Sequence, residues 1–184
     1  IRNEVLKLLP DQLIALLVCI FNVAIAHCHF PAAWKTATVI GIHKPGKKAA
    51  LPDSYRPISL LNTIGKIYER LLLNRLKTVV TNKNLFPPEQ FGFRAKHSCP
   101  DQVLRLTEHI TSGFANHITP QRTVAVFFDV AKALDKVWHA GLVHKLHQLQ
   151  IPDRLVHIIH AYLSDRNFRY RVEGAHSTPH PIRS

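Results

Sequence analysis

The strongest constraint on the fold is a pair of short strand-like segments joined by a basic turn. Residues 36–42 (TATVIGI) are rich in β-branched side chains, which favour extended backbone. A Pro-Gly turn loaded with lysine follows at 44–48 (KPGKK), and 54–61 (SYRPISLL) can return as a second strand. Pro57 has no N–H to donate, so this second strand belongs at a sheet edge or a bulge. The sequence therefore predicts a β-hairpin with a cationic tip.

Apolar residues at helical spacing predict most of the remaining structure. A helical stretch at 3–28 is broken near Pro10, and its expected apolar face consists of Leu13, Leu16, Leu17, Ile20, Phe21 and Ala24. Further helices are predicted at 63–80, from Ser98 to Phe114, at about 139–149 and at 153–164.

Two more strands are expected. TVAVFF at 123–128 has the unbroken apolar character of a buried strand and ends at Asp129. Polar and apolar residues alternate at 168–172, and Glu173-Gly174 suits a turn. Helices and strands are mixed without regular alternation, so we expect an α+β fold with a helical layer packed on a small, mostly antiparallel sheet.

The charge balance favours a polyanionic partner. Lys and Arg number 24 against 12 Asp and Glu, which gives a formal net charge of +12. Such an excess attracts nucleic acid or an acidic surface, although a globular protein can also be basic for no such reason. The chain contains no methionine, so we expect either that its start has been processed away or that it is a piece of a longer reading frame.

Several other sites are disfavoured. The cluster His27-Cys28-His29 has no second pair of ligands at zinc-finger spacing, so a zinc site is not expected. The longest apolar run, 13–26, contains Asn22 and is shorter than the ~20 residues that span a bilayer, so we expect no membrane partner. A two-metal nuclease would need clustered acids, whereas the 12 acidic residues are dispersed.

Two places carry residues suited to chemistry. If the hairpin forms, Lys44 and Arg56 place an ammonium and a forked guanidinium near one anionic group, a pairing suited to a triphosphate. The alternative is a solvated hairpin whose cations protect an edge strand. A carboxylate fixed at a strand end, as predicted for Asp129, suits a divalent metal, but such an Asp is often only a cap or turn residue.

Several motifs in register resemble the reverse transcriptases of non-long-terminal-repeat retrotransposons, in a style close to the jockey-like elements of arthropods. They cover nearly the whole chain and are WKTATVIGIHKPGKK at 34–48, SYRPISLL at 54–61, KIYER at 66–70, NRL at 74–76, EQFGFRAKHS at 89–98, DQ at 101–102, FFDVAKALDKVWH at 127–139, YLSDR at 162–166 and VEG at 172–174.

The resemblance implies a catalytic role for the segment that follows the apolar run. Asp129 matches the first catalytic aspartate, which binds two Mg²⁺ ions, with Mn²⁺ as an alternative, and the Val130 carbonyl is an additional ligand. Leu134 replaces the family's usual Phe, a flat ring beneath the sugar that collides with a 2′-hydroxyl. Sugar selection or activity is therefore expected to be impaired at this position.

The resemblance also implies how substrates are held. Lys44 and Arg56 match residues that grip the triphosphate of the incoming nucleotide. Lys47, Lys48 and Arg94 are expected along the template as phosphate contacts that carry no sequence information. The implied partners are an RNA template, a DNA primer, deoxynucleoside triphosphates and the remainder of the polymerase chain. The implied localisation is intracellular, in both cytoplasm and nucleus.

The same resemblance divides the chain into an N-terminal helical extension at 1–30, fingers at 31–120 and the first part of the palm at 121–184. The chain is therefore expected to be an N-terminal fragment of an RNA-directed DNA polymerase. The alternative is a relic or domesticated module that binds RNA or DNA without catalysis, with an affinity that falls as salt rises.

We expect the 184 residues to be inactive alone. The family continues into a Gly-x-Pro-Gln-Gly loop and an Ala-Asp-Asp turn that supply the other carboxylates, and one carboxylate cannot hold two Mg²⁺ ions. A primer-extension assay on an RNA template checks this expectation, and Mg²⁺-dependent synthesis by these residues would contradict it.

Overall fold

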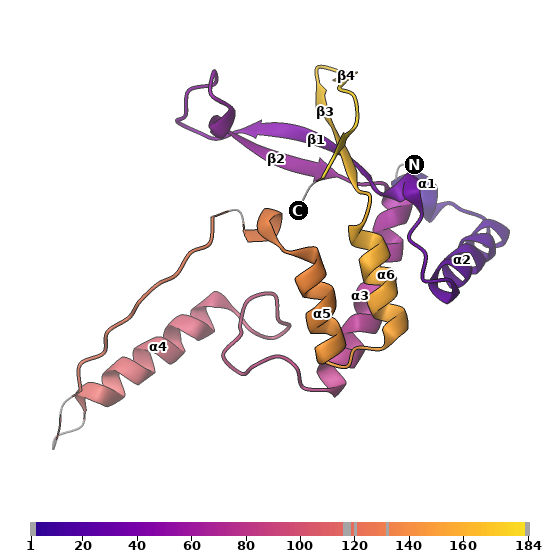
Figure 1. Ribbon diagram of the computed structural model, residues 1–184. Helices are drawn as coiled ribbons and strands as arrows, with labels where there is room; N and C mark the ends of the chain where they lie inside the picture. Colours follow the sequence, from indigo (N-terminus) through magenta and orange to yellow (C-terminus); the bar gives the residue numbers. More distant parts are fainter. Residues whose placement is uncertain (1–2, 116–118, 120, 132, 183–184) are drawn as a thin grey trace. The chain divides into compact units, whose positions relative to one another are not determined.

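A computed structural model describes residues 3–115, 119, 121–131 and 133–182 (Figure 1). The chain divides into two compact units, which are described separately. The first unit comprises Ile1–Val79 and Asp135–Ser184, and the second comprises Val80–Leu134. This division does not test the boundaries between extension, fingers and palm, which remain predictions.

The helices predicted from the sequence are confirmed, and their ends differ from the predicted ones by no more than two residues. They are α1 (Asn3–Lys7), α2 (Asp11–Ala26), α3 (Thr63–Asn82), α4 (Cys99–Phe114), α5 (His139–Gln148) and α6 (Asp153–Leu163). The structure also contains three short 3-10 turns that were not predicted, η1 (Ala32–Trp34), η2 (Pro52–Ser54) and η3 (Ala133–Lys136).

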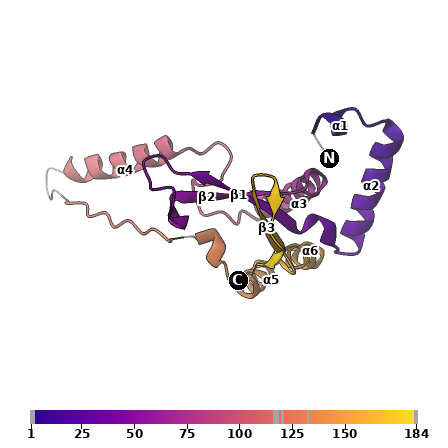
Figure 2. The ribbon, with the colours of Figure 1, turned by 90° about the horizontal axis from the view of Figure 1, so that it is seen from above.

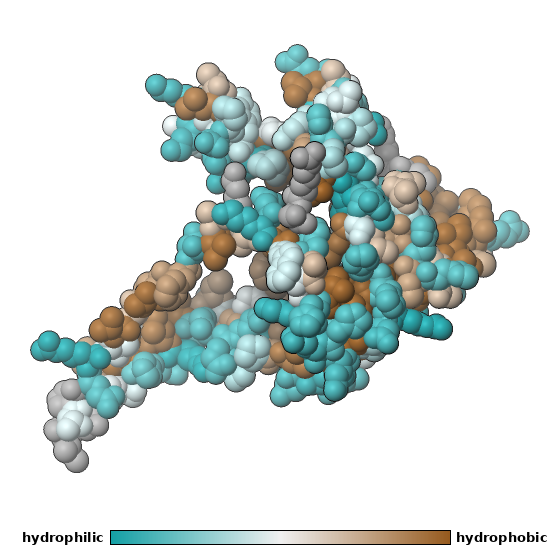
Figure 3. All heavy atoms as spheres, in the orientation of Figure 1, coloured by the Kyte–Doolittle hydropathy of each residue, from teal (hydrophilic) through white to brown (hydrophobic). Residues whose placement is uncertain are grey.

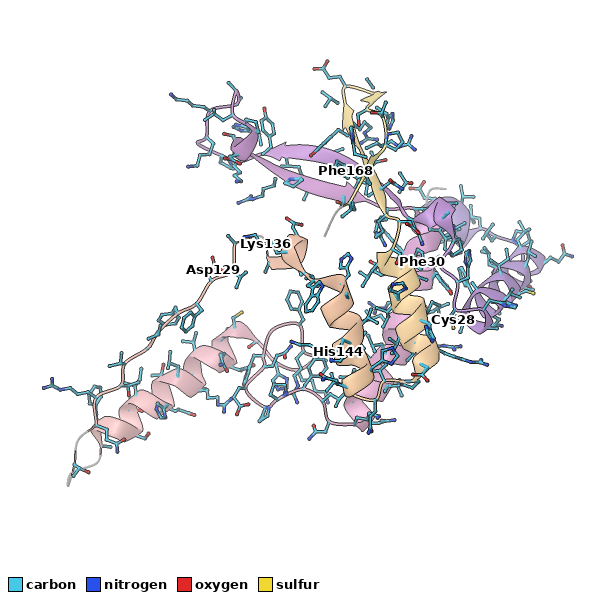
Figure 4. All side chains as sticks on the ribbon, viewed as in Figure 1. Cys28, Phe30, Asp129, Lys136, His144 and Phe168 are labelled. Carbon is cyan, nitrogen blue, oxygen red and sulfur yellow. The ribbon has the colours of Figure 1, made fainter. Side chains whose placement is uncertain are left out.

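An aromatic cluster forms the core of the first unit. Tyr68 of α3 is fully buried, and the rings of Phe21, Phe30 and Trp34 lie with their centroids 5.3, 5.5 and 5.4 Å from its own. The Tyr68 hydroxyl donates a hydrogen bond of 3.1 Å to the backbone carbonyl of His29. Phe30, labelled in Figure 4, also meets Tyr162 of α6 edge to face at 5.0 Å. The cluster therefore links α2, α3, α6 and the residues that lead into the sheet.

The sheet of the first unit is mixed and has the strand order β2-β1-β3-β4, with β5 pairing on β3. Among the described strands only the β1–β3 pairing is parallel, so the predicted, mostly antiparallel sheet within an α+β fold is confirmed. The strands are β1 (Thr36–His43), β2 (Tyr55–Leu60), β3 (Asn167–Val172), β4 (Ala175–His176) and β5 (His180–Pro181).

Both predicted hairpins form. β2 is the edge strand, where Pro57, opposite Gly41 of β1, removes no ladder hydrogen bond from the interior of the sheet. β3 turns into β4 through Glu173 and Gly174, whose φ angles are +49° and +86°. Two successive positive φ values fit the sharp turns that join antiparallel strands with the correct twist. Figures 1 and 2 both show the β1–β2 hairpin extending away from α2.

The second unit is built on α4, which begins directly after Ser98, within one residue of the predicted start. The Ser98 hydroxyl accepts a hydrogen bond from the Asp101 backbone N–H at 3.3 Å, and the Asp101 carboxylate accepts one from the Ser98 N–H at 3.0 Å. This reciprocal capping box satisfies two amide groups that the first turn leaves without helical partners.

The predicted strand at 123–128 is wrong. Residues 121–130 contain no strand, and the side chains of Val124, Phe127 and Phe128 are 86%, 85% and 91% exposed. In Figure 3, drawn in the orientation of Figure 1, hydrophobic surface in brown follows the extended segment that leads from α4 to η3. A strand needs a neighbour for its N–H and C=O groups, and no described strand pairs with this segment. Apolar composition alone therefore leaves it extended but outside any sheet.

The apolar face predicted for α2 is only partly buried. Phe21 and Ala24 are each 6% exposed, whereas Leu13, Leu16 and Ile20 are 45%, 54% and 40% exposed. The described contacts of this helix with the aromatic cluster are at its C-terminal half, so the earlier turns remain uncovered. None of the described helices is both long enough and apolar enough to cross a membrane.

The buried hydroxyl of Tyr68 leads us to expect that the protein loses folding stability at alkaline pH. Burial, reinforced by Cys28, raises the pKa of the Tyr68 hydroxyl to about 12 from its ordinary 10.0. The unfolded chain releases this proton first as pH rises, so the stabilisation is complete below pH 10 and is lost between about 10 and 12. At ~1.4 kcal/mol per pKa unit the loss approaches roughly 3 kcal/mol.

The measurement is urea unfolding followed by circular dichroism at several alkaline pH values. Tyr68→Phe should lower stability at neutral pH by about 1 kcal/mol through loss of the hydrogen bond to His29. It should also flatten the fall above pH 10. Parallel curves for the two proteins would contradict the assignment to Tyr68.

Candidate functional site

The structure brings Lys44 and Arg56 together on one face of the β1–β2 hairpin. Arg56 lies opposite Ile42 in the ladder, and the Lys44 backbone N–H donates to the Ser54 carbonyl at 2.7 Å, which continues the pairing by two positions. Side chains two positions apart on a strand share a face. Lys44 and Arg56 are therefore diagonal cross-strand neighbours, and residues in this relation are typically about 7–8 Å apart.

Hydrogen bonds within the hairpin tip hold this arrangement. The Lys44 ammonium donates to the Asp53 carbonyl at 2.7 Å, and the Tyr55 hydroxyl donates to the Ala49 carbonyl at 3.0 Å. Arg56 is exposed. Among the described residues no carboxylate forms an ion pair with Lys44 or Arg56. The two cations therefore keep their charge uncompensated and suit an anion that binds over this face.

The residues predicted along the template lie in two different units. Lys47 and Lys48 are exposed at the hairpin tip, beside Gly46, whose φ of +75° permits the tight turn. Arg94 belongs to the second unit, is half-buried, and donates a hydrogen bond of 3.1 Å to the Pro87 carbonyl. The Arg94 guanidinium is thus partly engaged in holding its own loop.

Asp129, Val130 and Leu134 lie in the second unit without a sheet to position them. Figure 4 shows Asp129 on the extended segment before η3. Val130 and Leu134 are 63% and 85% exposed. The Asp129 carboxylate and the Val130 carbonyl are oxygen ligands of the kind that Mg²⁺ prefers. The described part of the chain, however, contains no group of three or more His, Cys, Asp or Glu residues placed to hold a metal. Over the described residues these two donors alone do not complete a metal site.

An apolar groove between α3, α5 and α6 was not anticipated from the sequence. It has a volume of about 490 Å³, and aliphatic side chains of the three helices line it. Tyr162 lies at this groove, and burial, with a contribution from Glu69, raises the pKa of its hydroxyl while Arg166 opposes the shift. The sequence signal for this groove is the spacing of Leu72, Leu73 and Leu76. These residues give α3 an apolar side that is wider than the part used for its contacts with the core.

Comparison with known proteins places these features in a family context. A family model described as reverse transcriptase (RNA-dependent DNA polymerase) matches residues 42–183. The chain is 42% identical over 182 residues to a probable RNA-directed DNA polymerase from transposon BS of Drosophila melanogaster, with 99% of this chain and 20% of the relative covered. It is 41% identical over 180 residues to the RNA-directed DNA polymerase from mobile element jockey of the same species, with 98% and 19% covered.

A third relative is the probable RNA-directed DNA polymerase from transposon X-element of Drosophila melanogaster, which is 37% identical over 182 residues, with 99% of this chain and 20% of the relative covered. The chain thus spans about a fifth of the length of these relatives. The resemblance inferred from the motifs is confirmed.

The absence of a ladder at 121–130 predicts rapid amide exchange there. Backbone N–H groups outside a sheet or helix are open to solvent, so peptides that cover 124–130 should exchange orders of magnitude faster than peptides from β1. Hydrogen–deuterium exchange by mass spectrometry checks this with β1 as the internal control. Comparable protection of the two segments would contradict this expectation and would support a strand at 123–128.

Proposed function

The chain belongs to the reverse transcriptase family, and we propose from that premise that it forms the nucleotide-gripping and template-facing part of an RNA-directed DNA polymerase. The observation that carries the proposal is the placement of Lys44 and Arg56 on one face of a basic hairpin. These two side chains have complementary ways of binding phosphate oxygens, as a point charge and as a planar fork.

In the proposed reaction the primer 3′-oxygen attacks the α-phosphorus of a deoxynucleoside triphosphate. The 3′-hydroxyl gives up its proton to solvent, a new phosphodiester bond forms, the bond to the β-phosphate breaks, and pyrophosphate leaves. Lys44 and Arg56 would hold the triphosphate in place, so that the α-phosphate meets the primer at a fixed position. The carbonyl of Asp53, which accepts from Lys44, keeps the ammonium oriented at the tip.

Asp129 and the Val130 carbonyl are proposed to supply ligands to Mg²⁺ in the assembled enzyme. When bound, the metal would stabilise charge on the reacting phosphate and the leaving group. Leu134 is proposed to lie beneath the sugar, where its branched chain would exclude a 2′-hydroxyl less completely than a flat ring.

Lys47, Lys48 and Arg94 are proposed to contact template phosphates. The partners of this function are an RNA template, a DNA primer and the rest of the polymerase, at an intracellular location. Within it, residues 31–120 would form the fingers and residues 121–184 the start of the palm.

A non-catalytic module that binds nucleic acid is the second candidate. The observation in its favour is that, over the described residues, Asp129 has no neighbouring group of acids with which to hold metal. Such a module would bind an oligonucleotide but would not distinguish a nucleoside triphosphate from other polyanions.

Nucleotide binding separates the two candidates. Arg56→Ala should weaken the binding of dTTP by about tenfold, since a charge-assisted bond to phosphate is worth roughly 1.5–3 kcal/mol before solvent screening. Arg56→Lys should restore part of that loss, because the charge returns without the fork. Isothermal titration calorimetry on the 184-residue chain, with Mg²⁺ present, supplies the measurement.

Arg154→Ala is the matched control, because Arg154 is an exposed arginine on α6 of the same unit. It should change the dTTP affinity by less than about twofold, as expected for a screened surface charge. Equal losses for Arg56→Ala and Arg154→Ala would count against a nucleotide site at the hairpin.

A further inference from the structure

The hairpin face that carries Arg56 continues across the sheet onto two arginines of β3. In the ladder Thr38 of β1 lies opposite Leu60 on one side and Arg169 on the other. Residues directly opposite in neighbouring strands share a face, and so do residues two apart in one strand. Arg171 therefore joins Arg169 on the face that also holds Arg56.

This face is open and lacks negative charge. Arg56 and Arg171 are exposed and Arg169 is half-buried. No residue in the five strands is Asp or Glu, and among the described residues no carboxylate forms an ion pair with these arginines. The positive potential of the arginines is thus not neutralised within the sheet, and it acts on any molecule that approaches this face.

Aliphatic side chains occupy the middle of the same face. Ile42, Ile58 and Leu60 are 49%, 39% and 37% exposed, and the register places them with Arg56 and Arg169. A surface that is aliphatic at its centre and cationic on two sides can contact bases and sugars while the arginines hold phosphates. If the cations served only to protect a solvated edge strand, the face would need no exposed aliphatic side chains. The exposed aliphatic centre therefore favours a surface that binds a ligand.

The dimensions of the face fit several nucleotides. Arg56 and Arg169 lie four residues apart along β1, or about 13 Å, and two strand spacings apart across the sheet, or about 10 Å. The two arginines are thus separated by roughly 16 Å, which corresponds to about five stacked nucleotides at ~3.4 Å each.

We propose that Arg169 and Arg171 bind phosphates of an unpaired RNA strand, which crosses the open face of the sheet towards the Lys44–Arg56 site. This inference rests on the proposed function, which supplies the template as the ligand. Because backbone contacts carry no sequence information, the face should bind single strands of any sequence.

The test is fluorescence anisotropy of a labelled single-stranded RNA of mixed sequence, titrated with the 184-residue chain at several salt concentrations. The double variant Arg169→Ala/Arg171→Ala should bind about tenfold more weakly near 100 mM salt, and the slope of log affinity against log salt should fall by about 1.4, at ~0.7 per phosphate contact. Arg169→Lys/Arg171→Lys should keep the salt slope of the unaltered chain, because both charges remain.

The matched control is Lys77→Ala/Arg154→Ala, which removes two exposed charges from α3 and α6 of the same unit. It should change RNA affinity by less than about twofold. Equal losses for the two double-alanine variants, or no RNA binding by the unaltered chain, would overturn the inference. Displacement of the RNA by an acidic polypeptide at equal charge concentration would overturn it too, in favour of a protein ligand.

Binding of dTTP, measured in parallel, separates this inference from the proposed function. If Arg56→Ala leaves dTTP binding unchanged while Arg169→Ala/Arg171→Ala still weakens RNA binding, the nucleotide site fails and the RNA-binding face stands. The reverse pattern supports the nucleotide site and overturns the RNA-binding face.

Discussion

The packing of aromatic rings around Tyr68 is the interaction on which the first unit depends. Phe21 comes from α2, Phe30 from the segment after it, and Trp34 from the turn that enters β1. Aromatic rings bury large areas and gain further from edge-to-face contact, so one cluster can join elements that share few other contacts. The direction in which β1 leaves the helices is thereby set by the same side chains that hold the helices together, and the position of the basic hairpin follows from β1.

Local rules account for most of what the sequence could predict. Pro10 separates α1 from α2, Ser98 and Asp101 start α4, and Glu173-Gly174 turns β3 into β4, each through the conformations open to a few neighbouring residues. The pairing that puts Arg56 opposite Ile42 belongs to the same class, because β1 and β2 are neighbours in the sequence.

Long-range pairing accounts for the errors and omissions. Val124 to Phe128 has the composition of a buried strand, but composition cannot say whether a partner strand exists, and none of the described strands pairs with it. The basic face across β1 and β3 could not be predicted for the same reason, because Arg169 joins Arg56 only through a parallel pairing between distant parts of the chain. A metal site at Asp129 likewise depends on residues distant in the sequence, and the described residues hold no group of three or more His, Cys, Asp or Glu placed to bind a metal.

The parallel pairing also has a consequence for how the molecule assembles. More than half of the chain separates Thr38 from its partner Arg169, so closing that loop costs configurational entropy before any contact compensates. The β1–β2 hairpin can form early from local contacts, whereas the sheet is completed only after β3 has been synthesised. Until then one side of β1 presents unpaired backbone groups, and a nascent chain paused at this stage would be exposed to strand-mediated association with other molecules.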